Sequence, residues 1–254
     1  MSDVEAIRSL DQHNVEIHEN RLNWDRKPVL RKIYRGFHSQ IRRWLCDDID
    51  GATVELGSGL GQIKDVIPTC ITTDVVPNPW LDRTENAYEL SFANQSVANL
   101  IVFDVWHHLR YPGTALLEMW RVLAPGGRVV IFEPCMSILG LLVYGIFHHE
   151  PLGLRQRITW LAPEGFNATD ADYFAAAGNA WRVFHLRPRK PLDGWRIVEV
   201  KRSAALSYVA SGGFRGPQLY PTSLLPLLRS VDSVLDYFPA AFATRMLVVL
   251  EKIT

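Results

Sequence analysis

The stretch Ala52-Thr53-Val54-Glu55-Leu56-Gly57-Ser58-Gly59-Leu60-Gly61 decides how this chain folds. Its first five residues predict a short strand, and the glycines after them predict a sharp turn. Glycine at alternate positions lets a ligand approach the backbone without meeting a Cβ atom. A helix that follows such a turn offers free N–H groups to a carboxylate or a phosphate. The stretch therefore predicts a ligand-binding loop, although a glycine-rich turn alone is equally compatible with a structural role.

The segments on either side of this loop alternate between strands and helices. Apolar runs predict further strands over residues 69–75, 100–104, 128–133, 195–201 and 246–251, and helices over 114–123 and 224–238, with a tight turn at 125–127. Near-continuous apolar strands separated by helices indicate a parallel sheet covered on both faces, hence an α/β fold.

Acidic residues end several of these strands. Glu55 precedes the glycines, Asp74 ends the second strand, and Asp104 and Glu133 end later ones. Ligands of open parallel sheets bind at the carboxyl ends of the strands, where a carboxylate such as Asp74 can accept hydrogen bonds from both ribose hydroxyls. Alone, each carboxylate is also typical of an ordinary strand-end turn. Together they favour a nucleoside-binding site.

Four segments follow one another along the chain: Val54-Glu55-Leu56-Gly57-Ser58-Gly59-Leu60-Gly61, Asn86-Ala87-Tyr88-Glu89-Leu90-Ser91-Phe92, Phe103-Asp104-Val105-Trp106-His107-His108 and Arg121-Val122-Leu123-Ala124-Pro125-Gly126-Gly127-Arg128. In this order they resemble the acidic-x-Gly-x-Gly-x-Gly signature, the "D-A-x-x-L-P-F" segment, the strand end with a histidine pair and the "R-V-L-K-P-G-G" turn of the class I S-adenosylmethionine-dependent methyltransferases, and most closely the group called methyltransferase type 11. The resemblance covers roughly residues 50–135. It implies a Rossmann-like, mostly parallel sheet of seven strands with the last strand antiparallel, and helices on both faces.

The resemblance also implies S-adenosyl-L-methionine as the cofactor and assigns its contacts. The glycine loop would hold the methionine part, Asp74 the ribose, and Val75 one face of the adenine. Asn86 replaces the aspartate that usually contacts the adenine amino group, and Ala87 would contribute its backbone. The full set of expected cofactor-binding residues is Glu55, Gly57, Ser58, Gly59, Gly61, Asp74, Val75, Asn86, Ala87, Asp104 and Trp106. The chain departs from the family at Ser91, where proline is usual, and in a very short segment after the loop.

Methyl transfer from a sulfonium is an in-line displacement that needs alignment and, for a hydroxyl acceptor, often a general base. His107 and His108 follow the strand that ends at Asp104, and they are the candidate catalytic bases. A structural role for the pair is the alternative. Trp106 is either a cation–π partner of the sulfonium or a core residue. His148, His149 and Glu150 resemble metal ligands, but adjacent histidines rarely face one ion, so we expect no metal site.

Outside the matched segment, the sequence predicts an N-terminal helical cap over 1–48, with Pro28 at a first helical position, and a methyltransferase domain over 49–254. That domain would carry a substrate-side insertion over about 135–193 and a flap over about 204–240 with glycine hinges. The apolar run 138–147 predicts a buried helix or a pocket wall. Aromatic residues (Trp160, Phe166, Tyr173 and Phe174) and a basic cluster (Arg182, Arg187, Arg189, Lys190, Arg196, Lys201 and Arg202) follow it.

An apolar wall with a basic rim would suit an acceptor that is lipid-linked or nucleotide-linked; a core helix beside a solvated surface is the alternative. The formal net charge is zero, which argues against nucleic-acid binding. Three dispersed cysteines and the lack of a long apolar segment favour the cytoplasm. We therefore expect an O-methyltransferase acting on a small molecule or glycan. A nucleic-acid or protein methyltransferase, a non-catalytic cofactor-binding module and a nicotinamide-dependent oxidoreductase are the alternatives. The sequence leaves the acceptor, the methylated atom and the oligomeric state open.

Overall fold

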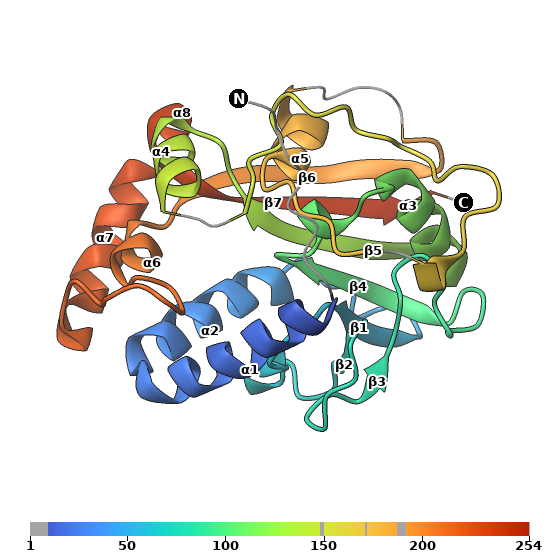
Figure 1. The fold of residues 1–254 in the computed structure, drawn as a ribbon, viewed down its shortest axis with the longest axis horizontal. Coiled ribbons are helices and arrows are strands. Elements are labelled where there is room, and N and C mark those ends of the chain that lie inside the picture. The colour runs from blue at the N-terminus through green and yellow to red at the C-terminus, as the bar shows by residue number, and fades with distance from the viewer. Residues whose placement is uncertain (1–9, 148–149, 171, 187–191, 254) are drawn as a thin grey trace.

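A single seven-stranded sheet forms the centre of the molecule in the computed structural model, which describes residues 10–147, 150–170, 172–186 and 192–253. The strand order is β3-β2-β1-β4-β5-β7-β6, and β7 runs antiparallel to both of its neighbours (Figure 1). The strands are β1 (Ala52–Leu56), β2 (Ile71–Asp74), β3 (Arg83–Thr84), β4 (Val97–Phe103), β5 (Leu123–Pro134), β6 (Trp195–Ala204) and β7 (Ala243–Lys252). The expected fold, with its antiparallel last strand, is confirmed.

Alternate residues of the central strands supply two separate cores, one on each face of the sheet. Leu100 and Val102 of β4 pack with α3 (Pro112–Val122) and with α5 (Asn179–Trp181). Ile101 and Phe103 point to the opposite face and pack with α2 (Pro28–Arg42). This two-residue alternation is what a central strand covered on both faces requires.

The N-terminal segment is a helical hairpin of α1 (Leu10–Arg26) and α2. Pro28 occupies the first turn of α2, as its fixed φ favours. Val29, Ile33 and Ile41 lie on one side of α2 and are almost completely buried against the sheet. Figure 1 shows the hairpin beside the sheet, and α2 packs against one face of that sheet.

Two connections are shorter than the separate helix and the separate turn that an α/β fold usually has at these places. The segment after the glycine loop forms only a short 3-10 helix, η1 (Gln62–Asp65), in agreement with the short segment expected there. The expected turn at 125–127 lies inside β5, where the pairing with β4 shifts between Val97 and Asn99 and Gly126 adopts a φ of 77°. The turn is thus a bulge within one strand.

Besides β6, β7 and α5, the described part of the chain after β5 forms further short helices. They are α4 (Ile138–Ile146), η3 (Ala168–Asp170), η4 (Arg182–Leu186), α6 (Leu206–Ala210), η5 (Thr222–Leu224), α7 (Leu225–Leu235) and α8 (Pro239–Phe242). Of the two expected roles of 138–147, the buried helix is wrong, because Ile138, Ile146 and Phe147 are at least 65% exposed. The segment instead contributes to the wall of a pocket, which was the alternative. Among the described residues, no helix combines the length and apolar character needed to cross a membrane.

Candidate active site

The glycine loop joins β1 to η1 and is shaped by close backbone packing. Gly57 has a φ of 66°, and a Cβ atom there would lie 2.3 Å from Cγ2 of Val105, so only glycine fits. Gly59 also has a positive φ, and a Cβ atom there would project into open space. The loop is fixed from outside by Trp80, whose indole N–H donates to the Gly59 carbonyl at 2.8 Å.

A pocket of about 840 Å³ opens directly above this loop. It is within the usual size of small-molecule sites. Nine of the expected cofactor-binding residues line it, from the ends of β1, β2 and β4 and from the segment after β3: Glu55, Gly57, Ser58, Gly59, Asp74, Val75, Asn86, Ala87 and Asp104. The carboxyl ends of the parallel strands therefore converge as the sequence predicted.

Two buried carboxyl groups give this part of the pocket its charge character. Glu55 is 3% exposed, and its Oε2 atom has no hydrogen-bond partner among the described residues. Burial raises the pKa of Glu55 to about 8. Asp74 Oδ2 accepts the N–H of Gly59 at 3.0 Å, and burial likewise raises the pKa of Asp74. Glu55, which has one oxygen without a partner among the described residues, and Asp74 at its strand end lie in one cavity. Together they fit a ligand with a positive charge and vicinal hydroxyls.

The segment after β3 explains one departure from the family pattern. Glu85, which also lines the pocket, accepts the Ser91 backbone N–H at 2.8 Å and forms a second hydrogen bond with the Ser91 hydroxyl. Proline at position 91 would offer neither donor. The side-chain amide oxygen of Asn86 accepts the Tyr88 N–H, so an adenine amino group bound there would share this oxygen.

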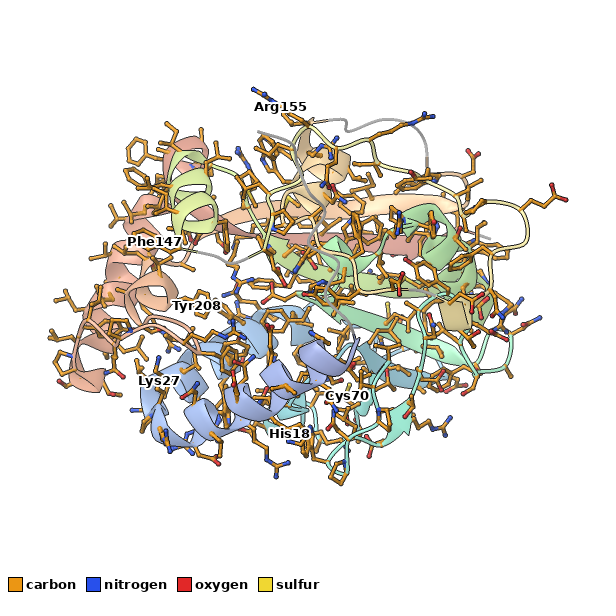
Figure 2. The ribbon with its side chains drawn as sticks, in the orientation of Figure 1. His18, Lys27, Cys70, Phe147, Arg155 and Tyr208 are labelled. Atoms are coloured by element: carbon orange, nitrogen blue, oxygen red, sulfur yellow. The ribbon has the colours of Figure 1, made fainter. Side chains whose placement is uncertain are left out.

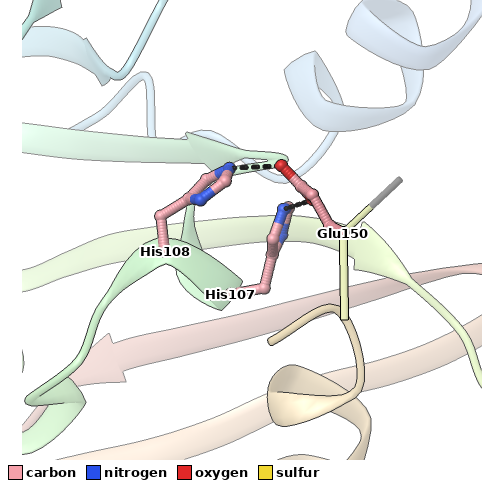
Figure 3. Close-up of side chains that lie close together, drawn as sticks. All are labelled: His107, His108 and Glu150. Carbon is pink, nitrogen blue, oxygen red and sulfur yellow. Dashed lines mark hydrogen bonds and ion pairs between the residues drawn. The ribbon is translucent and has the colours of Figure 1, made fainter. Parts of the chain in front are cut away.

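The other half of the pocket holds a cluster of histidine and carboxylate side chains (Figure 3). His107 lies between two carboxylates, with Nδ1 2.6 Å from Glu133 Oε2 and Nε2 3.2 Å from Glu150 Oε2. His108 Nδ1 faces the Phe174 carbonyl at 2.8 Å, and its Nε2 lies 3.7 Å from Glu150 Oε1.

These contacts argue against the proposed base role of His107. Burial lowers its pKa, but Glu133 and Glu150 outweigh burial and hold the pKa of His107 well above its usual range. A protonated ring cannot accept a proton. Burial, and then the charge of His107, lower the pKa of His108 to about 3, which makes His108 a weak base at neutral pH.

Solved structures that share this fold include proteins described as methyltransferases. An S-adenosylmethionine-dependent methyltransferase from Archaeoglobus fulgidus is 12% identical, with a TM-score of 0.53 over 87% of this chain and 94% of its own. A chain from the complex between the Haloferax volcanii Trm112 methyltransferase activator and a methyltransferase is 14% identical, with a TM-score of 0.52 over 98% and 100%. A Thermotoga maritima protein described as a possible histamine N-methyltransferase is 13% identical, with a TM-score of 0.50 over 94% and 99%.

These low identities show the fold alone, and a match within the sequence adds to them. Residues 54–131, which include the glycine loop, Asp74 and the histidine pair, match the model of the methyltransferase domain family, type 11. The chain is a class I S-adenosylmethionine-dependent methyltransferase. No curated protein matches its sequence.

Two expected cofactor contacts are not found in the pocket of this methyltransferase. Trp106 is completely buried on the other side, where its ring lies 4.8 Å from that of Phe184, so it cannot cover a sulfonium. Trp106 begins η2 (Trp106–His108), and its side chain packs in the core, which was the alternative expectation for this residue, whereas the two histidines of η2 line the pocket. Gly61 faces Leu81 outside the pocket and serves the turn, with a φ of 69°.

The methyltransferase closes its pocket with segments from both ends of the chain. His13, Glu16 and Ile17 of α1 line one side, and the loop at 212–217 lines another. Arg215 of this loop pairs with Glu16 at 3.2 Å, and Lys27 donates to the carbonyls of Gly213 and Gly216. The expected flap is therefore tied to the N-terminal hairpin.

Several pocket residues of the methyltransferase were missed by sequence reasoning. Arg245, at the start of β7, is 2% exposed and pairs with Asp104, which has a positive φ of 54°. The only signal was an arginine next to an apolar strand. His38 and Tyr208 also line the pocket and come from α2 and α6.

The expected basic rim is not a single surface. Arg182 donates to the carbonyls of Gly153 and Gln156, and Arg196 pairs with Glu251 at the far end of β6. Arg187, Arg189 and Lys190 lie outside the described residues, as do His148 and His149. Of the expected aromatic wall, Tyr173 and Phe174 line the pocket, whereas the Trp160 carbonyl accepts the Gly113 N–H and Phe166 packs on Tyr88 and Tyr111.

Proposed function

We propose that this methyltransferase transfers a methyl group to a hydroxyl group of a small-molecule or glycan acceptor. One observation carries the proposal: the residues expected to hold the cofactor and an apolar wall line the same pocket. The cofactor supplies the methyl group on a sulfonium. In the proposal, Glu55 accepts hydrogen bonds from the ammonium group of the cofactor, and Asp74 accepts them from the ribose hydroxyls. Gly57 and Gly59 let the cofactor approach the backbone.

The acceptor half of the pocket favours a ligand with an apolar part. This half is lined by four apolar side chains: Val143 of α4, Phe147 just after α4, Phe174, and Leu219 after the flap. Phe147, labelled in Figure 2 at the end of α4, is 79% exposed, so the apolar wall continues to the surface. Because Arg182 and Arg196 are bound elsewhere, the proposal keeps the apolar part of a lipid-linked acceptor and does not rely on a basic rim.

The proposed catalysis rests on alignment more than on proton removal. His107 is held between carboxylates and His108 is a weak base, so neither is suited to deprotonate a hydroxyl group by itself. The pocket lies between α1 and the flap, and these walls support a fixed orientation of the acceptor.

The test is an acceptor screen that measures release of S-adenosylhomocysteine. Phenolics, lipid-linked sugars and sugar nucleotides form the hydroxyl arm, and each active compound is repeated as its methyl ether, which should be inert. Amines, RNA and a peptide library form the rival arms. Turnover confined to a rival arm would overturn the proposal. Cofactor binding without turnover in any arm would instead favour a non-catalytic binding module.

A further inference from the structure

The histidine pair and Glu150 bring three ligand atoms together inside the pocket. The tight turn of η2 places the two neighbouring rings side by side, with their centroids 4.1 Å apart. Both Nε2 atoms face the Glu150 carboxylate, and one atom from each of the three residues lies within 4.8 Å of the others (Figure 3). Adjacent histidines were expected not to share an ion, and the 3-10 geometry removes that objection.

The Nδ1 atoms of both rings are held by acceptors outside this group. Glu133 Oε2 accepts from His107 Nδ1 at 2.6 Å, and the Phe174 carbonyl accepts from His108 Nδ1 at 2.8 Å. Metal-binding histidines nearly always donate their second N–H to a carboxylate or a backbone carbonyl in this way, because the contact fixes the ring and its tautomer. The two outer contacts therefore direct both Nε2 atoms to one point, where a metal ion would take the place of the proton on His107 Nε2.

We propose that His107, His108 and Glu150 bind a divalent first-row transition metal ion. Two imidazole nitrogens and one carboxylate are the donor set of open transition-metal sites, whereas Mg²⁺ and Ca²⁺ prefer oxygen ligands alone. Metal–ligand bonds of about 2.0–2.2 Å require ligand atoms roughly 3–3.5 Å apart. The separations of 3.2 and 3.7 Å between the ring nitrogens and Glu150 are close to this range.

The charge around the cluster supports a cation. Glu133 is fully buried and the Glu150 side chain is 9% exposed, so two carboxylates lie in a region of poor solvation beside the two rings. A divalent ion would offset this charge. This assignment replaces the sequence-based expectation that the chain has no metal site.

The position of the ion suggests its use. The three ligands line the same pocket as the glycine loop, and the His108 side chain is 21% exposed toward it. Three protein ligands leave coordination positions open, as catalytic metal sites do. There the ion would hold the acceptor's nucleophilic atom and lower its pKa. This use, unlike metal binding itself, rests on the proposed function.

The experiment is a metal titration of the full chain after removal of any affinity tag and treatment with a chelator. Co²⁺ is followed by visible absorption and Zn²⁺ by calorimetry. We expect one ion per chain. Glu150→Gln and His108→Gln should each weaken binding more than tenfold, and Glu133→Gln, which leaves all three ligands in place, should weaken it by about 10–100-fold. His18→Ala removes an exposed histidine of α1 outside the pocket and should change nothing.

The proposal is overturned if no ion binds, or if all three cluster variants bind it as the wild type does. Circular dichroism of each variant shows whether it is folded, and the Glu133→Gln result stands if a ligand variant is not. Binding of S-adenosylhomocysteine, measured in the same preparations without metal, separates the two proposals. If the wild type does not bind S-adenosylhomocysteine, the proposed function is overturned and the metal site is unaffected.

Discussion

Glu55 buries a carboxyl group next to the glycine loop, with a pKa raised to about 8 from an ordinary value of 4.5. The folded protein therefore keeps this proton while the unfolded chain releases it. Between about pH 4.5 and 8 the free energy of unfolding should fall as the pH rises, at a slope from this group of at most about 1.4 kcal/mol per pH unit. Glu55→Gln removes this contribution, so the variant should gain stability relative to wild type over that range.

Urea unfolding of the ligand-free protein at pH 5, 6.5 and 8 measures this difference. Asp65→Asn is the control, because Asp65 is on the surface, where it pairs with Arg35. A stability difference between Glu55→Gln and wild type that stays constant with pH would contradict the prediction. The cationic cofactor should bind with release of the Glu55 proton below pH 8, which calorimetry in buffers of different ionisation enthalpy detects.

In the proposed cofactor site, the Asp74 carboxylate binds the ribose hydroxyls as a charged group while it also holds the glycine loop. It accepts the Gly59 N–H at 3.0 Å. We expect Asp74→Asn to weaken S-adenosylhomocysteine binding by about 1–3 kcal/mol, through the loss of charge-assisted hydrogen bonds. Calorimetry at pH 7.5 measures this, again with Asp65→Asn as the control. Equal affinities for the variant and the wild type would remove Asp74 from the cofactor site.

At the scale of elements, one lysine joins the N-terminal hairpin to the flap. Lys27, labelled in Figure 2, lies between α1 and α2, and its ammonium group donates to the Gly213 carbonyl at 2.7 Å and to that of Gly216. Lys27→Met keeps the length of the side chain but removes these bonds. Amide exchange over residues 212–219 should become about tenfold faster, as expected for a loss of about 1.4 kcal/mol.

Hydrogen–deuterium exchange by mass spectrometry resolves this segment. Lys32→Met is the matched control, because Lys32 is an exposed lysine of α2. Exchange over 212–219 that is equal in both variants would show that the loop is held by its own contacts, such as the Gly216 N–H to the Gly212 carbonyl.

The strands were predictable because their burial is written into the local pattern. Val97–Phe103 is buried at every position, and its last four residues form an unbroken apolar run. The glycines and Asp74 mark the ends of β1 and β2. The exposed face of α4 was not predictable, because an apolar run carries no sign of what covers it. Nor was the cluster around His107, since Glu150 reaches it from a segment without regular structure. The sequence left Trp106 between the pocket and the core, because a 3-10 turn obeys neither the strand nor the helix period.

At the scale of the whole molecule, the cofactor should bind the folded state alone and stabilise it. At a ligand concentration of 100 times Kd this linkage contributes about 2.7 kcal/mol. For a chain of this size it should raise the melting temperature by about 5–10 °C. A thermal-shift measurement with S-adenosylhomocysteine tests this, with NAD(H) as the control ligand. Stabilisation by NAD(H) and none by S-adenosylhomocysteine would contradict the cofactor assignment.

The tie between α1 and the flap has a consequence for synthesis. Residues 52–104 contain the glycine loop, Asp74 and Asp104, but the pocket wall also needs Arg215 and Leu219, and Arg245 comes later still. A chain emerging from the ribosome would thus contain the glycine loop, Asp74 and Asp104 long before the rest of the pocket wall was made. Tight retention of the cofactor would begin only after the last strand had inserted between β5 and β6. Cofactor retention would then report completed synthesis and not only a completed motif.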